Sequence, residues 1–253
     1  MRFSLLGIFI GLWFISSVVA AQNVIRFATE ASYPPFESIE NDQFVGFDID
    51  LARALCQQMN SHCVFSHQPF DSLLASIEFG RYDAAISAID ITPEREQQVM
   101  FTHSYLMNGA VFVAKSGRFN SYQQLHQRVI AVQNGSSEQQ YLLDYFVSHG
   151  TIAIPYASYQ LALSDLQGGK VDSVLVDQAV AADWLHRHPG FSVVDSEITS
   201  KDYFGRGFGI AVNKENQQLA DRFNQALDAI KKNGIYQQIY SHYFADEKKV
   251  YEN

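Results

Sequence analysis

The sequence predicts an α/β protein built as two lobes, and three observations support that prediction. From Val24 onward, short β-rich runs alternate with amphipathic helical runs, which is the pattern of mainly parallel sheets covered by helices. The alternation starts over near residue 128, so two similar α/β units follow each other. Glycine-bearing extended segments, 109–115 and 205–212, follow the first and second units, and they predict two crossovers with a cleft between the lobes.

Each element of the first unit is assigned from its own pattern. The third strand is apolar almost throughout, which is typical of a sheet interior. Asp48 is expected to cap the first helix, and Asp71 and Gly80 are expected to begin and end the second. The expected strands cover 24–29, 63–67 and 83–89, and the expected helices cover 47–59 and 71–80.

The second unit repeats this alternation, and two further helices close the chain. Gly234 separates the closing helices, which need a sheet to cover, and the first sheet is a candidate. The expected strands of the second unit cover 128–133, 151–156 and 172–177, its helices cover 137–150, 159–169 and 178–188, and the closing helices cover 217–232 and 235–244.

The chain is therefore expected to leave the first lobe and to return to it. Closing helices that cover the first sheet require a lobe built from two separate parts of the chain. The predicted lobe 1 comprises 22–108 and 209–253, lobe 2 comprises 109–208, and the hinges lie near 107–111 and 205–210.

The N-terminus has the composition of a secretory signal peptide. Arg2 precedes an apolar run that starts at Phe3, and the small residues Ala20 and Ala21 form a cleavage site, so 1–21 is expected to be removed. A membrane anchor is the alternative, although the apolar run is near the lower length limit for spanning a bilayer.

The two cysteines, Cys56 and Cys63, lie at the end of one element and the start of the next. In an exported protein this pattern predicts a disulfide, whose short loop predicts about 2 to 3 kcal/mol of stabilisation. A metal site that also uses His62 and His67 is the alternative.

Composition and charge limit the classes of partner. Hydrophobic residues make up 47% of the chain and aromatic residues 13%, which is enough to fill the cores of a globular protein. The formal net charge of −9 disfavours nucleic acid and anionic membrane surfaces as partners. A cationic small ligand is compatible with it.

Charged and aromatic side chains follow the carboxyl ends of the predicted strands. In open parallel sheets, ligands bind at these ends. Another strand end leads through Asn134 and Gly135 into a helix. The candidate residues are Glu30, Tyr33, Phe70, Asp90, Arg95, Ser136, Ser137 and Asp177.

Arg95 and the acids together suit an amino-acid zwitterion. A guanidinium matches a carboxylate bidentately, and a buried aspartate needs a cationic partner. Thr92 as N-cap and Pro93 at the first helical position are expected to fix the turn that carries Arg95. The alternative is a structural ion pair between Arg95 and a neighbouring acid such as Asp90 or Glu96.

The remaining candidates have a structural and a binding interpretation. The helix start at Ser136 and Ser137 resembles an anion site, because its free N–H groups and dipole favour a carboxylate, but a plain capped helix explains it as well. Tyr33 and Phe70 could stack on a ligand side chain, or they could belong to the core.

Six segments of the sequence, taken in order, resemble one family. They are SYPPFESI, GFDIDLARALC, FDSLLASIEFGRYDAAISAIDITPER, NGSS, DLQGGKVDSVLVDQAV and KDYFGRGFGIAV. The chain from Val24 to Phe244 resembles the periplasmic amino-acid-binding proteins of ABC importers, most of all their arginine-binding branch, close to the lysine/arginine/ornithine binders. The resemblance implies the type II periplasmic-binding fold, in which two α/β lobes joined by two crossover strands close on a ligand.

The resemblance also implies roles for the backbone charges of the ligand. Arg95 would bind the α-carboxylate together with backbone N–H groups near Ser137, and Asp177 would bind the α-ammonium. Asp90 stands where relatives often have a hydroxyl that faces the ammonium, and Ser87 would offer its carbonyl or hydroxyl there.

Other residues would contact the side chain of the ligand. Tyr33 and Phe70 would sandwich it, and Glu30 stands where the lysine/arginine/ornithine binders place an aspartate for the distal cation. Ala88 and Gln133 replace residues that vary with specificity. The surplus of Glu30 and the aspartates over Arg95 favours a ligand with net positive charge.

The expected function is periplasmic capture of a cationic L-amino acid in a Gram-negative bacterium. Arginine is the leading ligand, with lysine, ornithine and histidine as alternatives. The expected partner is the membrane permease of an ABC importer, and we expect a monomer without cofactor, metal or nucleic acid. A cyclohexadienyl dehydratase-like enzyme on the same fold and a ligand-sensing domain are the rival functions.

Overall fold

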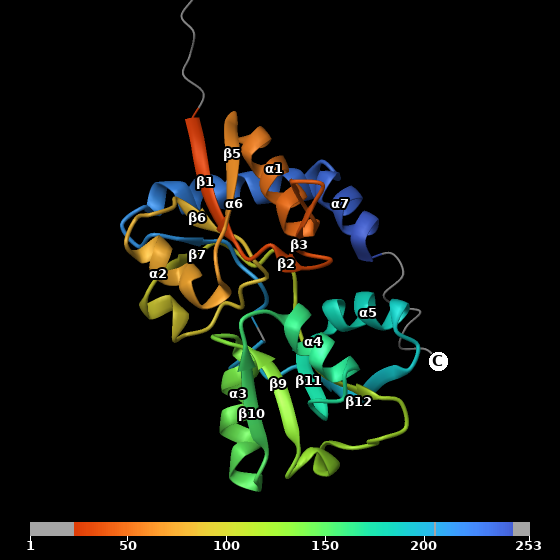
Figure 1. The fold of residues 1–253 in the computed structure, drawn as a ribbon. Coiled ribbons are helices and arrows are strands. Elements are labelled where there is room, and N and C mark those ends of the chain that lie inside the picture. Colours follow the sequence, from red (N-terminus) through yellow and green to blue (C-terminus); the bar gives the residue numbers. More distant parts are fainter. Residues whose placement is uncertain (1–22, 205, 245–253) are drawn as a thin grey trace, which may run out of the picture.

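The computed structural model describes residues 23–204 and 206–244, and the predicted signal peptide lies outside the described residues. Two five-stranded sheets form the framework (Figure 1), and we call the parts built on them the first and second lobes. The first sheet has the order β5 (Ser61–His67), β1 (Asn23–Thr29), β6 (Ala84–Ala85), β13 (Ala211–Val212) and β7 (Met100–Phe101). The second has the order β10 (Ile152–Tyr156), β9 (Val129–Gln133), β11 (Ser173–Asp177), β8 (Ala110–Lys115) and β12 (Phe191–Ile198).

Helices cover both sheets, as the alternating pattern predicts. The first lobe has α1 (Phe47–Gln58), α2 (Leu73–Glu78), α6 (Gln217–Lys232) and α7 (Ile235–Phe244), and a small sheet of β2 (Ser32–Tyr33), β3 (Glu37–Glu40) and β4 (Gln43–Val45). The second lobe has α3 (Ser137–Tyr145), α4 (Tyr159–Gln167) and α5 (Gln178–Arg187). Single 3-10 turns are η1 (Phe70–Ser72), η2 (Arg95–Gln97), η3 (Tyr122–Leu125) and η4 (Val147–His149).

Strand alternation divides the core of the first lobe into two faces. Phe27 on β1 points to one face, where it stacks on Phe65 and contacts Phe223 of α6. Ala28 points to the other face and packs with Leu73 of α2. Because each face buries several large apolar side chains, at about 1.5–3 kcal/mol apiece, the sheet is held from both sides.

Strand directions bring the predicted site together. β1 runs parallel to β5 and β6, and β9 runs parallel to β10 and β11. The carboxyl ends of β1 and β6 therefore lie at one edge of the first sheet, and those of β9 and β11 at one edge of the second. Antiparallel β13 and β8 bring the chain into each sheet from the other lobe.

The two crossovers run between β7 and β8 and between β12 and β13, and they pair with each other. The N–H of Phe208 donates to the carbonyl of Leu106 at 2.8 Å, and that of Tyr105 donates to the carbonyl of Phe208 at 2.9 Å. Gly207 has φ 72°, and a Cβ there would lie 2.2 Å from the carbonyl oxygen of Leu106. Only glycine fits this close approach without a shift. The predicted two-crossover fold is confirmed, whereas the residue boundaries of the lobes stay a prediction.

The structure corrects three local predictions. Asp48 is not an N-cap, because α1 begins at Phe47 with Gly46 as its cap. Asp71 does not cap α2 either: it lies in η1, and its carboxylate accepts a hydrogen bond from the second lobe. The strand expected over 83–89 is reduced to Ala84 and Ala85, and the chain turns at Ala88, whose φ is +45°.

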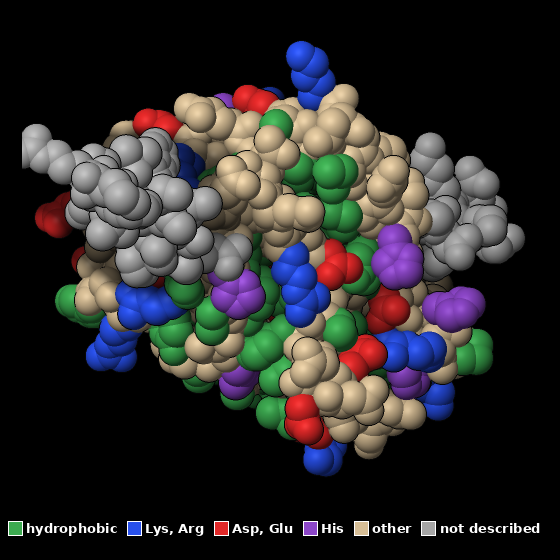
Figure 2. Space-filling view, turned by 90° about the horizontal axis from the view of Figure 1, so that it is seen from above, with side chains coloured by type: hydrophobic (Ala, Val, Ile, Leu, Met, Phe, Trp, Pro, Cys, Tyr) green, Lys and Arg blue, Asp and Glu red, His purple; other side chains and the backbone are tan. Residues whose placement is uncertain are grey.

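The predicted disulfide between Cys56 and Cys63 is confirmed; it links α1 to β5 with a Cα–Cα distance of 5.9 Å. Among the described residues no group of three or more His, Cys, Asp or Glu side chains is arranged to hold a metal ion. No helix in the described ranges has the length and apolar character needed to cross a bilayer. Acidic and basic side chains are interspersed on the face shown in Figure 2.

Candidate functional site

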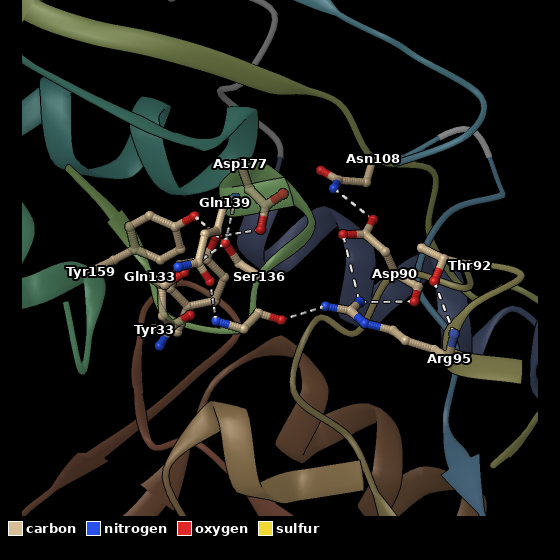
Figure 3. A network of polar contacts seen from close by, with 11 residues as sticks. Tyr33, Asp90, Thr92, Arg95, Asn108, Gln133, Ser136, Gln139, Tyr159 and Asp177 are labelled. Atoms are coloured by element: carbon tan, nitrogen blue, oxygen red, sulfur yellow. Dashed lines mark hydrogen bonds and ion pairs between the residues drawn. The ribbon is translucent and has the colours of Figure 1, made fainter. Parts of the chain in front are cut away.

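The predicted site residues meet where the two lobes face each other (Figure 3). Tyr33, Asp90 and Arg95 come from the first lobe, and Gln133, Ser136 and Asp177 come from the second. Hydrogen bonds, ion pairs or ring contacts join most of them directly. Their convergence agrees with the expectation from the strand ends, while their roles toward a ligand stay predictions.

Arg95 lies at the junction of the lobes with its side chain 11% exposed. Its Nη1 donates to the backbone carbonyl of Asp90 at 2.9 Å and lies 4.0 Å from the Asp90 carboxylate. Its Nη2 donates to the carbonyl of Gly135 in the second lobe at 3.1 Å, and the guanidinium lies 5.6 Å from the ring centroid of Phe70. Thr92 Oγ1 accepts from the N–H of Arg95 at 3.2 Å, but the predicted cap is wrong, because the 3-10 turn begins at Arg95 with Glu94 as its N-cap. Arg95 thus contacts both lobes.

The structural alternative for Arg95 is only partly realised. The pair with the Asp90 carboxylate is at the limit of an ion pair, and Glu96 pairs with Arg206 instead. The guanidinium is oriented mainly by the backbone carbonyls of Asp90 and Gly135. Because carbonyl oxygens leave its positive charge uncompensated, Arg95 keeps the capacity to bind a carboxylate.

Asp177 ends β11 and is 4% exposed. The hydroxyl of Tyr33 donates to its Oδ2 from the first lobe, while Oδ1 is buried without a hydrogen-bond partner among the described residues. Burial raises the pKa of Asp177 well above its usual range, and the neighbouring Glu138 and Asp90 raise it further. An unpartnered carboxylate oxygen in such surroundings favours a cation.

Asp90 faces the same region from the first lobe. Asn108 Nδ2 donates to its Oδ1 at 3.0 Å. Burial raises the pKa of Asp90 to about 7, Glu138 adds to the rise, and Arg95 opposes it. Because Glu138 raises the pKa of both Asp90 and Asp177, these three acids lie close together.

Glu30 follows β1 and is 2% exposed. Ser32 Oγ donates to its Oε1, and its Oε2 has no hydrogen-bond partner among the described residues. Burial raises the pKa of Glu30, whereas Ser32, His67 and Gln133 lower it. Gln133 ends β9 of the second lobe and interacts with Glu30, so Glu30 lies at the interface between the two lobes.

Ser87 and Ala88 form a turn after β6. The hydroxyl of Ser87 donates to Glu37 Oε1 at 2.6 Å and accepts from the N–H of Glu30 at 3.0 Å. The N–H of Ala88 donates to Asp48 Oδ2 at 2.7 Å. Both residues are buried. The side chain of Ser87 is therefore engaged by the protein, which leaves the backbone of the turn as the group available for a ligand.

The start of α3 in the second lobe has features both of a plain capped helix and of an anion-binding site. Ser136 is a plain N-cap: its Oγ accepts from the N–H of Gln139 at 3.1 Å and donates to the carbonyl of Gln133 at 2.9 Å. Ser137 Oγ, by contrast, is buried without a hydrogen-bond partner in the described part of the chain. The position next to the cap thus offers a donor at the positive end of α3.

Aromatic side chains flank the site, and one of them was missed. Tyr33 stacks on Tyr159 of α4 with ring centroids 5.2 Å apart, and Tyr159 donates to Ser136 Oγ at 3.4 Å. Phe70 is half-buried and contacts Arg95. Tyr159 begins a helix, a position that carries no sequence signal for a binding site.

Glu138 is the second residue that sequence reasoning missed. It lies in the first turn of α3, is 2% exposed, and its Oε1 has no hydrogen-bond partner among the described residues. An acid in the first helical turn usually interacts favourably with the helix dipole at the surface, so its presence there suggested nothing more. Its place directly after Ser137, on a helix aimed at the interface, is the signal that could have found it.

A groove of about 690 Å³ opens between the lobes on the Arg95 side. Phe70, Arg95, Ser136 and Ser137 line it. A second groove of about 290 Å³ lies beside Tyr33 and Tyr159. Glu30, Asp90 and Asp177 line neither groove and lie in the interior, so the acids are separated from solvent in this conformation.

Comparisons with known proteins agree with this geometry. The family model for bacterial extracellular solute-binding proteins, family 3, matches residues 25–246. ABC transporter arginine-binding protein 1 of Escherichia coli is 45% identical over 226 residues, which cover 89% of this chain and 92% of that protein. The arginine-binding periplasmic protein of Mannheimia haemolytica is 42% identical over 224 residues, covering 88% and 92%.

Solved structures show the same relationship. A Salmonella typhimurium periplasmic binding protein, solved to explain its high arginine specificity, superposes with a TM-score of 0.84 at 37% identity and covers 88% of this chain and 99% of that one. These relatives are binding proteins, which supports the prediction of a binding protein over an enzyme. The chain belongs to the bacterial extracellular solute-binding proteins, family 3.

Proposed function

We propose that this protein binds a cationic L-amino acid, arginine above all, between its two lobes and delivers it to the membrane permease of an ABC importer. The observation that carries the ligand class is the charge of the site. The site residues include four buried acids, Glu30, Asp90, Glu138 and Asp177, and one arginine, Arg95, which lies beside Asp90. The names of the relatives support arginine over the other cationic amino acids.

Charge balance favours a ligand that brings two cationic groups. Buried carboxylates without partners are strongly disfavoured, and nearby positive charge stabilises them. Arginine supplies an ammonium and a guanidinium, and its carboxylate needs Arg95. A neutral ligand such as glutamine or citrulline supplies one cationic group less, so at least one more acid would have to stay protonated.

Each end of the ligand has a matching set of groups. Arg95 and the N–H group at Ser137, next to Ser136, would hold the α-carboxylate, and Asp177 with Asp90 and the Ser87–Ala88 backbone would hold the α-ammonium. Glu30 would take the distal cation with Gln133 beside it, and Tyr33 and Phe70 would flank the side chain. Glu138, beside Asp177 and Asp90, adds negative charge at the ammonium end.

Lobe closure would complete the site, because neither lobe contains all of these groups. We assign lobe 1 to 22–108 and 209–253, lobe 2 to 109–208, and the hinges to 107–111 and 205–210. Hinge motion between two rigid lobes is a common mode of ligand capture. We also propose that the signal peptide directs the protein to the periplasm and that the protein acts there as a monomer.

A thermal-shift screen tests the proposed ligand class. The mature protein is heated with each of the twenty amino acids, ornithine and citrulline. A ligand present at 100 times its dissociation constant adds about 2.7 kcal/mol of stability. Arginine should give the largest shift and the other cationic amino acids smaller ones, whereas an equal or larger shift with glutamine would overturn the proposal.

A further inference from the structure

Two carboxyl groups lie buried beneath the Ser87–Ala88 turn, outside the proposed ligand contacts. Glu37 comes from β3 and Asp48 from α1, and both side chains are fully buried. Glu37 Oε1 accepts from Ser87 Oγ at 2.6 Å, and Asp48 Oδ2 accepts from the N–H of Ala88 at 2.7 Å and from Tyr105 Oη at 2.8 Å. One oxygen of each group is thus satisfied.

The second oxygen of each carboxyl group lacks a donor. Glu37 Oε2 and Asp48 Oδ1 have no hydrogen-bond partner among the described residues, and neither group forms an ion pair there. The groups near the pair are Ser87, Tyr105, Glu30 and Tyr236, and none of them is a cation. Two adjacent buried carboxylates cannot both ionise at low cost.

One proton between the two groups resolves both deficits, because a neutral carboxyl group donates to a neighbouring carboxylate. Burial raises the pKa of Glu37 well above its usual range, and the neighbouring Asp48 raises it further. Burial also raises the pKa of Asp48, to about 7, and the hydrogen bonds from Ala88 and Tyr105 oppose that rise. Glu37 is therefore the group that keeps the proton, and Asp48 is the acceptor.

We propose that Glu37 and Asp48 share one proton and act as a positioning pair that holds the Ser87–Ala88 turn in its ligand-binding shape. Ala88 has φ +45°, a backbone conformation that residues with a Cβ rarely adopt, and its N–H is held by Asp48. Ser87 is held by Glu37 and in turn holds the N–H of Glu30. The pair thus supports two proposed ligand contacts: the Ser87–Ala88 backbone, which would bind the α-ammonium, and Glu30, which would bind the distal cation.

A double-substitution cycle tests this proposal. Glu37→Gln replaces the shared proton by an amide donor and keeps the acceptor for Ser87. Asp48→Asn keeps an acceptor for Ala88 and offers a donor to an ionised Glu37. Each single variant should therefore bind arginine within about threefold of the wild type. The double variant points two amide donors at each other, and we expect it to lose at least tenfold in affinity.

The same strand, β3, provides a control substitution. Glu40→Gln makes the same chemical change at an exposed position of β3 and should leave affinity and unfolding temperature unchanged. A double variant that behaves additively, or a Glu37→Gln variant that loses more than tenfold in affinity or fails to fold, would overturn the proposal. If both single variants fold and the double variant does not, the same coupling between the two residues would appear in stability.

Infrared spectroscopy tests the proton without any ligand. The difference spectrum between wild type and Glu37→Gln should contain the carbonyl band of a neutral carboxylic acid at pH 8. Its absence would overturn the shared proton. The proposal depends on the proposed function only through the affinity readout, so a protein that shows this band but binds no amino acid would contradict the proposed function and leave the shared proton intact.

Discussion

Arg95 in the first lobe donates a hydrogen bond to the carbonyl oxygen of Gly135 in the second lobe over 3.1 Å. A second contact lies beside it, where Asn134 Nδ2 donates to Asp71 Oδ2 at 2.7 Å. The proposed carboxylate site is therefore placed where the two lobes come into direct contact. Binding at Arg95 and closure of the lobes would be coupled because the same few residues serve both.

Replacing Arg95 tests its role as the carboxylate partner. Arg95→Ala would leave a buried ligand carboxylate unpaired, which costs about 3 to 5 kcal/mol, or a hundredfold or more in affinity. Arg95→Lys should recover only part of the loss, because an ammonium cannot form the planar bidentate contact. Titration calorimetry measures both, and near-native affinity of Arg95→Ala would contradict the assigned role.

Gly135→Ala should disfavour the closed conformation. Gly135 has φ 77°, and a Cβ there would lie 3.1 Å and 3.2 Å from side-chain and backbone atoms of Asp71 in the other lobe. The substitution should accelerate ligand release and enlarge the radius of gyration of the ligand-bound protein in small-angle scattering. Gly117→Ala is the matched control, because it has φ 72° with no atom within 4 Å of the added Cβ. If Gly135→Ala and Gly117→Ala had equal effects, backbone strain alone would explain the effect of Gly135→Ala, and the contact with Asp71 would not be needed.

Affinity should rise with pH through the titration of Asp90. Its pKa is raised to about 7, so in the ligand-free conformation it is largely protonated below that pH and must lose its proton to face an ammonium. Arginine affinity measured by calorimetry should therefore weaken between pH 8 and pH 6, and Asp90→Asn should flatten the profile. A wild-type profile that is flat over this range would show that Asp90 does not face the ligand cation.

The same titration affects stability with the opposite sign. A carboxyl group whose pKa is higher in the folded protein contributes stability at low pH, and this contribution is lost as the pH rises through the folded-state value. Asp90 thus stabilises the ligand-free protein most below its ordinary pKa, and this contribution falls as the pH rises through about 7. Ligand-induced stabilisation should for that reason be larger at pH 8 than at pH 6.

Removal of the disulfide should lower stability without changing specificity. The bridge between Cys56 and Cys63 closes a short loop between α1 and β5, so its loss should reduce the free energy of unfolding by about 2 to 3 kcal/mol. Denaturant unfolding of the double serine variant measures this loss. Among the described residues, no hydrogen bond or ion pair joins either cysteine to a proposed site residue. The preference for arginine over lysine should therefore stay the same, and a changed preference would place the bridge within the binding mechanism.

Much of the architecture could be predicted because it depends on periodicity along the chain. The α/β alternation, the restart near residue 128 and the two crossovers are local patterns, and the strand ends at Gln133 and Asp177 follow from them. Asp48 and Asp71 were assigned wrongly because an acid near a helix start has the same local pattern whether it caps the helix or accepts from a distant segment. Contacts between residues far apart in the sequence decided between the two.

The backbone conformation of Ala88 and the burial of Glu138 could not be predicted for a related reason. A positive φ at an alanine depends on the buried carboxylate that accepts its N–H, and that carboxylate lies forty positions earlier. Glu138 is buried only because α3 points into the interface between the lobes. Both features arise from tertiary packing, which the local sequence does not encode.

The most direct test of the central claim is titration calorimetry of the mature wild-type protein with arginine and with citrulline, which keeps the shape of arginine and lacks its side-chain charge. An acid-lined site with Glu30 at the distal position predicts at least hundredfold tighter binding of arginine. Equal affinity for the two ligands would contradict the claim that the buried acids select a cationic side chain.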